Sequence, residues 1–238
     1  MIEELGFKPL YQQVRLRLTQ RIADGVWKAG QIVPSEMQIA AELGVSQGTV
    51  RKALDEMTTA NLLVRKQGRG TFVASHSEAR ILFQFFKLKP DQADRVFPES
   101  LVISVRDASA SAEEAAKLGL FMGEPVIRIR RMRSLAGRRC IIETIVLATA
   151  VFDGLQEGEI PNNLYNTYAE RFGVTIAGGH ETLKAVVASA EEARDLGLPV
   201  GAPLLLIDRV ATSIEGRPME WRLSLCETSA MHYATELR

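Results

Sequence analysis

Cysteine is scarce in this chain of 238 residues, which contains only Cys140 and Cys226. Two cysteines cannot build the disulfide framework of a small secreted protein, so we expect a cytoplasmic protein in which both are buried as small hydrophobic residues. The sequence also lacks an apolar run near the ~20 residues of a membrane-spanning helix, and no basic-then-apolar secretion signal follows Met1. It therefore predicts no membrane partner.

Histidine is equally sparse, and His76, His180 and His232 do not have the spacing of metal ligands. No nucleophile–base pair and no phosphate-binding loop stands out either. We therefore expect neither a metal nor a cofactor.

Net charge is also absent, since 29 basic residues balance 29 acidic ones, but the balance hides an asymmetry. Residues 1–77 contain 10 Lys and Arg against 7 Asp and Glu, and residues 78–238 contain the remaining 19 against 22. A polyanionic partner is therefore expected at the N-terminal end of the chain, although so modest an excess would not identify one by itself.

Three helices are predicted in the first 60 residues. The first, over 10–24, has an apolar residue at every fourth position, which forms one buried stripe: Leu10, Val14, Leu18 and Ile22. A second begins with a capping box of Ser35 and Gln38 and stops at Gly44. A third, capped by Ser46, runs to about Ala60.

A β-hairpin follows, with strands over 62–66 and 71–73 and a glycine-rich tip at Gln67–Gly70. Three short helices and a hairpin predict a winged helix-turn-helix over residues 1–74. Small and polar residues over 75–80 then predict a linker, and a second domain occupies 81–238.

Gln47 and Arg51 lie four residues apart on the third helix and share its polar face. In a major groove Arg can bond bidentately to guanine and Gln to adenine, while Arg69 between two glycines can enter a minor groove. A single Gln/Arg pair is usually just a solvated helix face, so the prediction rests on the whole series of elements. Further candidates for contact with DNA lie at helix starts and on the hairpin: Ser35, Ser46, Thr49, Lys52, Arg65, Lys66, Gly68 and Gly70.

Five segments of this region strongly resemble the GntR family of transcription regulators: Pro9–Tyr11, Pro34–Glu36, Leu43–Ser46, Thr49–Leu54 and Gln67–Val73. The resemblance implies a homodimer that binds a palindromic double-stranded DNA operator through paired recognition helices. The family commonly has Arg where this chain has Met37, and often where it has Gln47. We expect the second departure to alter which base is read.

The remainder contains an internal repeat with an offset of 78 residues, in which Ala110–Pro125 recurs as Ala188–Pro203. Each copy predicts a capped helix, a glycine turn and two alternating strands about a polar turn. Two copies are too few for a solenoid. The expected fold class is α+β, with an antiparallel sheet, a pseudo-twofold arrangement and a pocket between the halves.

This second region resembles a UTRA domain, the effector module of the HutC-type branch, which shares its fold with chorismate lyase. The similarity is carried by Arg131–Arg133, Gly137, Glu143, Asn162–Tyr165 and Gly216–Glu220. It implies that an effector is bound by Arg131, Arg133, Glu143, Asn163, Tyr165 and Glu220. From the residues alone, the arginines and carboxylates could equally form surface ion pairs between strands.

Alternating Arg131 and Arg133 share one strand face and, with nearby carboxylates and a Tyr hydroxyl, suit a small anionic ligand. An organic acid, an amino acid or a sugar derivative would fit, but Phe85 and Phe86 stand where phosphosugar-binding relatives have Ser or Thr. The function expected is a ligand-released repressor. Two alternatives stay open: a chorismate-lyase-like enzyme using Glu143 or Glu220, or an architectural DNA binder without a ligand response.

Overall fold

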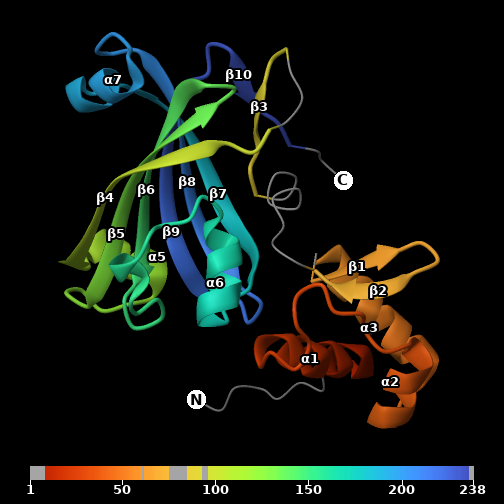
Figure 1. Ribbon diagram of the computed structural model, residues 1–238. Coiled ribbons are helices and arrows are strands. Elements are labelled where there is room, and N and C mark those ends of the chain that lie inside the picture. Colours follow the sequence, from red (N-terminus) through yellow and green to blue (C-terminus); the bar gives the residue numbers. More distant parts are fainter. Residues whose placement is uncertain (1–8, 61, 75–84, 93–95, 236–238) are drawn as a thin grey trace.

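The computed structural model describes residues 9–60, 62–74, 85–92 and 96–235. Helices dominate the N-terminal part and a sheet dominates the C-terminal part (Figure 1). The N-terminal elements are α1 (Leu10–Ala23), α2 (Glu36–Leu43), α3 (Gln47–Thr59), β1 (Leu63–Lys66) and β2 (Gly70–Val73). The predicted linker, 75–80, lies outside the described residues, so the domain boundaries remain predictions.

The helix ends of the N-terminal part lie where their capping residues predict them. The Ser35 hydroxyl accepts a hydrogen bond from the Gln38 amide at 3.3 Å, and Gly44 ends α2 in the left-handed conformation. Ser46 likewise caps α3. The predicted apolar stripe of α1 faces a core shared with α2, α3 and the hairpin, except that Leu10 is exposed. These elements form the expected winged helix-turn-helix.

The C-terminal part is built on a six-stranded antiparallel sheet in the order β4-β5-β6-β9-β8-β7, accompanied by a two-stranded pair of β3 and β10. Its strands are β3 (Leu88–Pro90), β4 (Glu99–Ser109), β5 (Pro125–Leu135), β6 (Arg138–Ala148), β7 (Ile176–Val187), β8 (Pro203–Ser213), β9 (Pro218–Cys226) and β10 (Met231–Tyr233). Its helices are α5 (Ala112–Leu118), the 3-10 turn η1 (Leu155–Glu157), α6 (Leu164–Phe172) and α7 (Ala190–Leu196).

The internal repeat folds into two matching units, α5-β5-β6 and α7-β8-β9, whose inner strands β6 and β9 pair at the centre of the sheet. Helix α5 contacts β9 of the other unit, and α7 contacts β6. Both helices cover one face, while α6 packs on the opposite face against residues such as Ile127 and Ile145 (Figure 1). The predicted pseudo-twofold α+β fold is confirmed.

Cys140 and Cys226 are both buried and free, as expected of small core residues. Within the described ranges no helix is long and apolar enough to cross a membrane. The same residues hold no cluster of His, Cys, Asp and Glu that could ligate a metal.

Candidate functional site

The first candidate site is the exposed face of α3. Gln47 and Arg51 project from its N-terminal half, and both are bound by the carboxylate of Glu36 at the start of α2. The Gln47 amide nitrogen lies 3.2 Å from Glu36 Oε2, and Arg51 Nε lies 2.9 Å from the same oxygen. One acidic residue therefore fixes the orientation of both predicted base-reading side chains.

The hydrogen bond from Arg51 holds the pKa of Glu36 below its ordinary value, so this carboxylate is charged at neutral pH. Sequence reasoning missed Glu36 because its position directly after the cap indicated only a favourable first-turn acid. The Met37 side chain beside it is largely exposed, so it offers no polar group at the place where many relatives have Arg.

Three of the predicted phosphate-binding cations already have partners within the domain. The Lys52 ammonium lies 3.9 Å from the centre of the Tyr11 ring, and the Lys66 ammonium lies 4.6 Å from that of Phe72. Arg65 forms an ion pair with Asp55. Surface pairs of this kind are weak, about 0–1 kcal/mol, so they do not prevent a phosphate from binding.

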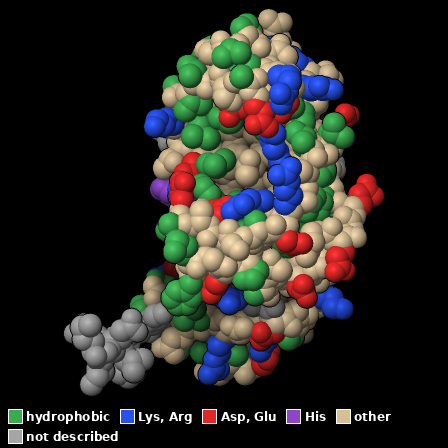
Figure 2. Space-filling model, turned by 90° about the vertical axis from the view of Figure 1, so that its left-hand side faces the viewer, with side chains coloured by type: hydrophobic (Ala, Val, Ile, Leu, Met, Phe, Trp, Pro, Cys, Tyr) green, Lys and Arg blue, Asp and Glu red, His purple; other side chains and the backbone are tan. Residues whose placement is uncertain are grey.

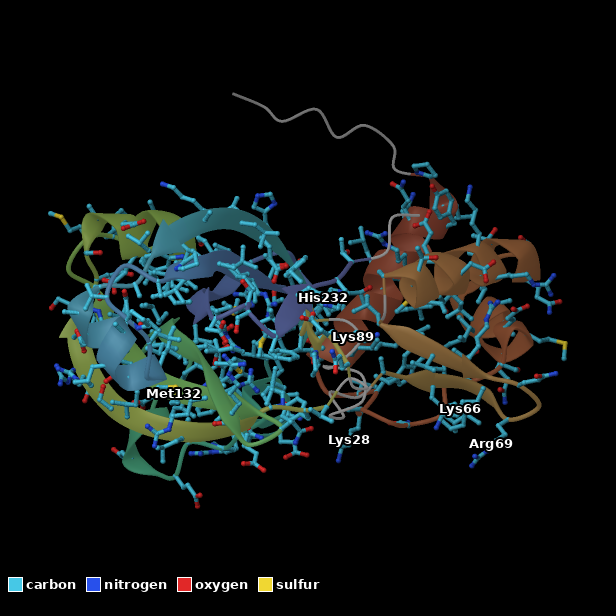
Figure 3. All side chains as sticks on the ribbon, turned by 90° about the horizontal axis from the view of Figure 1, so that it is seen from above. Lys28, Lys66, Arg69, Lys89, Met132 and His232 are labelled. Atoms are coloured by element: carbon cyan, nitrogen blue, oxygen red, sulfur yellow. The ribbon has the colours of Figure 1, made fainter. Side chains whose placement is uncertain are left out.

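Arg69 projects from the tip of the hairpin between β1 and β2, away from the body of the domain (Figure 3). Gly68 and Gly70 beside it have φ values of +68° and +103°, which side-chain-bearing residues rarely adopt. A Cβ at Gly70 would also lie 3.3 Å from the Ile32 side chain. Among the described residues, no carboxylate pairs with Arg69, so its charge faces solvent.

The second candidate site is a partly open cavity of about 40 Å³ between the two repeat units. Strands β5 and β6 contribute one side, β8 and β9 a second, and the start of α6 and the chain around Phe85 complete it. Its polar lining residues are Lys87, Arg131, Arg133, Glu143, Asn162, Asn163, Tyr165, Arg209, Arg222 and Ser224. The pocket predicted between the halves is therefore present.

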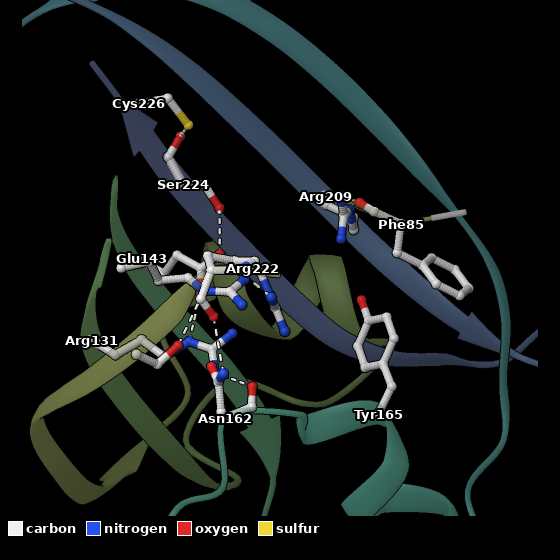
Figure 4. Close-up of polar contacts among 12 residues, drawn as sticks. Phe85, Arg131, Glu143, Asn162, Tyr165, Arg209, Arg222, Ser224 and Cys226 are labelled. Atoms are coloured by element: carbon white, nitrogen blue, oxygen red, sulfur yellow. Dashed lines mark hydrogen bonds and ion pairs between the residues drawn. The ribbon is translucent and has the colours of Figure 1, made fainter. Parts of the chain in front are cut away.

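Glu143 lies at the centre of the charged cluster (Figure 4). It is directly opposite Arg131 in the β5–β6 ladder, and Arg131 Nε donates to its Oε2 at 2.6 Å. Arg222 and Arg133 approach its other oxygen at 3.4 and 3.5 Å. Burial would raise the pKa of Glu143, but these guanidinium groups hold it well below its ordinary value.

Arg131, Arg133 and Glu143 are at most 4% exposed, so they are not surface ion pairs, and that alternative is wrong. The positive charge of Arg133 is less well neutralised than that of Arg131, because Arg133 lies 3.5 Å from Glu143 and Arg131 lies 2.6 Å from it. The Arg133 guanidinium lies between the rings of Phe86 and Phe97, at 5.3 and 5.6 Å from their centres. Burial lowers the pKa of Arg133 to about 9, and repulsion from Arg131 and Arg222 acts in the same direction against the attraction of Glu143.

Glu220 does not line the cavity, although the sequence placed it there. It is fully buried behind the wall, where Tyr165, Tyr168 and Arg222 donate to its carboxylate at 2.8–3.1 Å. Burial raises the pKa of Tyr165 to about 12, helped by the negative charge of Glu220. Glu220 therefore acts as support for Arg222 and Tyr165, both of which do face the cavity.

The start of α6 closes one end of the cavity. The Asn163 side chain caps this helix, accepting from the Asn166 amide at 3.1 Å, and the Asn162 carbonyl accepts from Arg131 at 3.2 Å. The predicted position of Asn163 and Tyr165 at a helix N-terminus facing the cavity is thus what the structure has.

Arg209, Arg222 and Ser224 line the cavity but escaped sequence reasoning. The repeat carried a signal for one of them, since Arg209 follows Arg131 by 78 residues. Arg209 lies opposite Arg222 in the β8–β9 ladder, as Arg131 lies opposite Glu143 in the β5–β6 ladder. The two repeat units therefore each bring a cross-strand pair of charged residues to the cavity.

Two family models match this chain, one over each of the parts that hold the candidate sites. Residues 10–73 match the bacterial regulatory proteins of the gntR family, and residues 94–232 match the UTRA domain. The chain is a GntR-family regulator with a UTRA domain. Such regulators bind DNA through the first part and small-molecule effectors through the second.

The regulator is similar along most of its length to named repressors. It is 32% identical to the histidine utilization repressor of Pseudomonas putida, over 86% of this chain and 82% of that protein. It is 29% identical to the transcriptional repressor NagR of Bacillus subtilis, over 89% and 88%. These relatives indicate that the chain is a DNA-binding transcriptional repressor and not an enzyme.

Solved structures of GntR-family regulators are also similar to this chain. A ligand-binding domain of a GntR-family regulator from Bordetella bronchiseptica covers 66% of this chain and 99% of its own, with 35% identity and a TM-score of 0.61. PhnF from Mycobacterium smegmatis covers 94% and 99%, with 26% identity and a TM-score of 0.58.

Proposed function

We propose that this regulator is a cytoplasmic repressor that binds a palindromic operator as a homodimer and releases it when a small anionic metabolite occupies the cavity. The observation that carries the proposal is the charge of the cavity wall. Among the described residues that line it, five are cationic, Lys87, Arg131, Arg133, Arg209 and Arg222, and Glu143 supplies the one carboxylate.

Among the described residues, the surrounding acids do not remove the excess carried by the arginines. Glu220 and Glu181 bind Arg222 and Arg209 from behind, which leaves four arginines near three carboxylates. A buried charge without a counter-ion is costly, so an incoming anion is favoured by the cluster that it neutralises. Arg133, with its lowered pKa, is the cation with most to gain.

The residues of the cavity wall also restrict which chemical groups the ligand carries. Guanidinium groups recognise carboxylate or phosphate oxygens bidentately, and Glu143, Ser224 and Asn163 can bond to hydroxyl or amino groups. An organic acid, an amino acid or a sugar derivative has both kinds of group.

On the DNA, Arg51 and Gln47 would read base edges in the major groove, while Arg69 enters the adjacent minor groove. The amide groups at the starts of α2 and α3, together with Ser35, Ser46 and Thr49, would bind phosphates. Lys52, Arg65 and Lys66 would add attraction that is independent of sequence.

A groove on the sheet face between α5 and α7 supports a second copy as the partner. It is lined by apolar Ile103, Leu206, Leu223 and Leu225 and by charges of both signs, including Arg106 and Asp107. Figure 2 shows hydrophobic, basic and acidic side chains side by side on the side of the molecule where β4 and α7 lie. Such a mixture can complement itself across a twofold axis.

The test is operator binding by the full chain with and without a panel of small organic acids, amino acids and sugar phosphates. We expect an anion to weaken operator binding by roughly 5- to 150-fold in gel-shift titrations. Arg133→Met, which keeps the volume of the side chain, should bind operator normally but lose that response. A panel with no effect, or an unchanged response in Arg133→Met, would contradict the proposal.

A further inference from the structure

The cavity wall formed by Phe85–Leu88 lies outside the six-stranded sheet that supplies the other walls from β5, β6, β8 and β9. Strands β5, β6, β8 and β9 belong to the six-stranded sheet, with ladders of six to ten residue pairs. Among the described residues, the backbone of Phe85–Leu88 is bonded to other strands through the three-residue ladder of β3 and β10 and through the bond from the Ala234 amide to the Lys87 carbonyl. A two-stranded ladder this short is marginally stable alone, so it opens more easily than a central strand.

The cavity requires some wall to move. Its volume of about 40 Å³ has room for a few water molecules, whereas pockets for small organic ligands measure about 300–1,000 Å³. The rings of Phe85 and Phe86 fill much of the boundary: Phe85 packs edge-on against Tyr165, with centres 5.0 Å apart, and Phe86 lies beside Arg133. Displacing this segment enlarges the cavity without breaking the sheet.

Arg209 ties the segment in place. One arm of its guanidinium donates to the backbone carbonyl of Phe85, and its Nε donates to Glu181 at 2.6 Å (Figure 4). Tyr233 on β10 donates to the same Glu181 carboxylate. The bond to Phe85 pairs a cation with a neutral carbonyl, whereas a carboxylate or phosphate carries the opposite charge and can bind a guanidinium through two parallel hydrogen bonds.

The same residues also face the DNA-binding part. Phe85, Lys87 and Arg209 line a second cleft, whose other side includes Arg15 and Leu16 of α1. A movement of Phe85 therefore changes the wall of this cleft.

We propose that Phe85–Leu88 is a gate over the effector cavity and that Arg209 is its latch, released when an anion takes the guanidinium from the Phe85 carbonyl. The gate then moves toward the cleft beside α1 and disturbs the seating of the DNA-binding part. The inference rests on the proposed function for the nature of the ligand. Its structural content, that Arg209 couples the cavity wall to operator binding, can be tested with no ligand present.

The experiment compares the full-length protein with Arg209→Met and with a matched control, Lys117→Met. Lys117 pairs with Asp208, the neighbour of Arg209 on β8, but on the opposite face of the sheet. We expect amide hydrogen exchange in the peptide covering 85–92 to become at least about tenfold faster in Arg209→Met, and ligand-free operator affinity to fall by about tenfold. The control should match the wild type in both measurements.

A reversible lock tests the same movement independently. Lys89 and His232 are directly opposite in the β3–β10 ladder and lie close together in Figure 3, so cysteines at both positions can be oxidised to join the strands. Added to Arg209→Met, the oxidised pair should restore slow exchange and operator affinity, and reduction should abolish both. Arg209→Lys replaces the methionine variant if that fails to melt cooperatively, because lysine keeps the charge beside Glu181 but cannot reach two acceptors with a rigid fork.

Wild-type exchange in the Arg209 variant would overturn the latch. Faster exchange with unchanged operator affinity, or a lock that fails to restore binding, would overturn the coupling. Because no ligand is added, these outcomes are separate from a failure of the anion panel, which would contradict only the nature of the effector.

Discussion

Arg51 and Gln47 reach the surface of α3 already bound to Glu36, so their side chains are oriented before any DNA arrives. This arrangement lowers the conformational entropy that Arg51 would lose on binding. It also means that a base competes with a carboxylate for the guanidinium, which penalises bases that cannot offer two acceptors. If Arg51 and Gln47 read bases as proposed, Glu36 would contribute to discrimination without touching the DNA.

Replacing Arg51 by alanine should remove most of the preference for the operator and leave the fold intact, because this side chain is more than half exposed. A bidentate contact with a base pair contributes about 1–3 kcal/mol of discrimination, or roughly 5- to 150-fold. The measurement is the ratio of affinities for a DNA selected by the wild-type protein and for an unrelated sequence. Arg194→Ala on α7 provides a control for loss of one charge, and an unchanged ratio in Arg51→Ala would remove this residue from base reading.

The proposed role of Arg69 depends on its charge and on its position at the hairpin tip. We expect Arg69→Ala to weaken operator binding and to lower the slope of log affinity against log salt by about one unit, since one phosphate-associated counter-ion is no longer displaced. Titrations at several salt concentrations measure the slope. A slope equal to that of the wild type would show that the hairpin tip does not approach the DNA.

At the scale of elements, the two repeat units show how one local motif acquires different surroundings. Helices α5 and α7 begin with the same capping box, Ser111 with Glu114 and Ser189 with Glu192. Glu114 is additionally bound by Arg128 at 2.6 and 2.8 Å, and this hydrogen-bonded ion pair lowers the pKa of Glu114 to about 2. The sequence of the boxes is shared, but the ion pair belongs to one of them.

The difference predicts a pH effect on stability. A carboxyl group with a lowered folded-state pKa stabilises the fold above its unfolded pKa of 4.5, and that contribution is lost as the pH falls from there toward about 2. Glu114→Gln should therefore lower stability by about 1 kcal/mol at pH 7, and the difference from wild type should shrink by pH 3. Glutamine keeps the cap, as Gln38 does in α2.

Urea unfolding at both pH values measures this change, with Glu192→Gln as the matched variant of the second repeat. Its carboxylate accepts from the Ser189 amide in the same way as Glu114 from Ser111. We expect it to follow the wild type at both pH values. A Glu114→Gln deficit that persists at pH 3 would show that packing, and not the ion pair, produces the effect.

At the scale of the whole molecule, the pseudo-twofold sheet presents two unlike faces. One face carries α6 and the cavity, and the other carries α5, α7 and the groove proposed to contact a second copy. Placing the effector and the partner on opposite faces of one rigid sheet separates ligand binding from assembly. The effector would then change how the DNA-binding parts are seated, and the dimer would persist.

A charge placed in the groove should break the proposed dimer. Leu223→Glu is expected to sediment as a monomer and to bind operator at least tenfold more weakly, because a buried unpaired carboxylate is costly and a lone half contacts one half-site. Leu183→Glu on β7, exposed and outside the groove, serves as control. Analytical ultracentrifugation distinguishes the outcomes, and a dimeric Leu223→Glu protein would place the interface elsewhere.

Several residues of the candidate effector site could be predicted from the sequence one residue at a time. Arg131, Arg133 and Glu143 follow from strand alternation together with the family resemblance, and the structure brings them within hydrogen-bonding distance. Glu220 was placed correctly on its strand, but which carboxylate faces the cavity depends on how β9 packs against α6. Arg209 required alignment of the two repeats followed by knowledge of the ladder register.

The sequence alone determined the winged helix-turn-helix and the pseudo-twofold sheet, because capping residues, glycine turns and apolar spacing act over a few residues and are legible locally. Tertiary structure alone decided the partners of the charged residues. Glu36 meets Arg51 from another helix, Glu143 is shared by three arginines, and Arg209 holds the carbonyl of Phe85 more than 120 residues away. These contacts depend on burial and on strands distant in sequence, which no local pattern encodes.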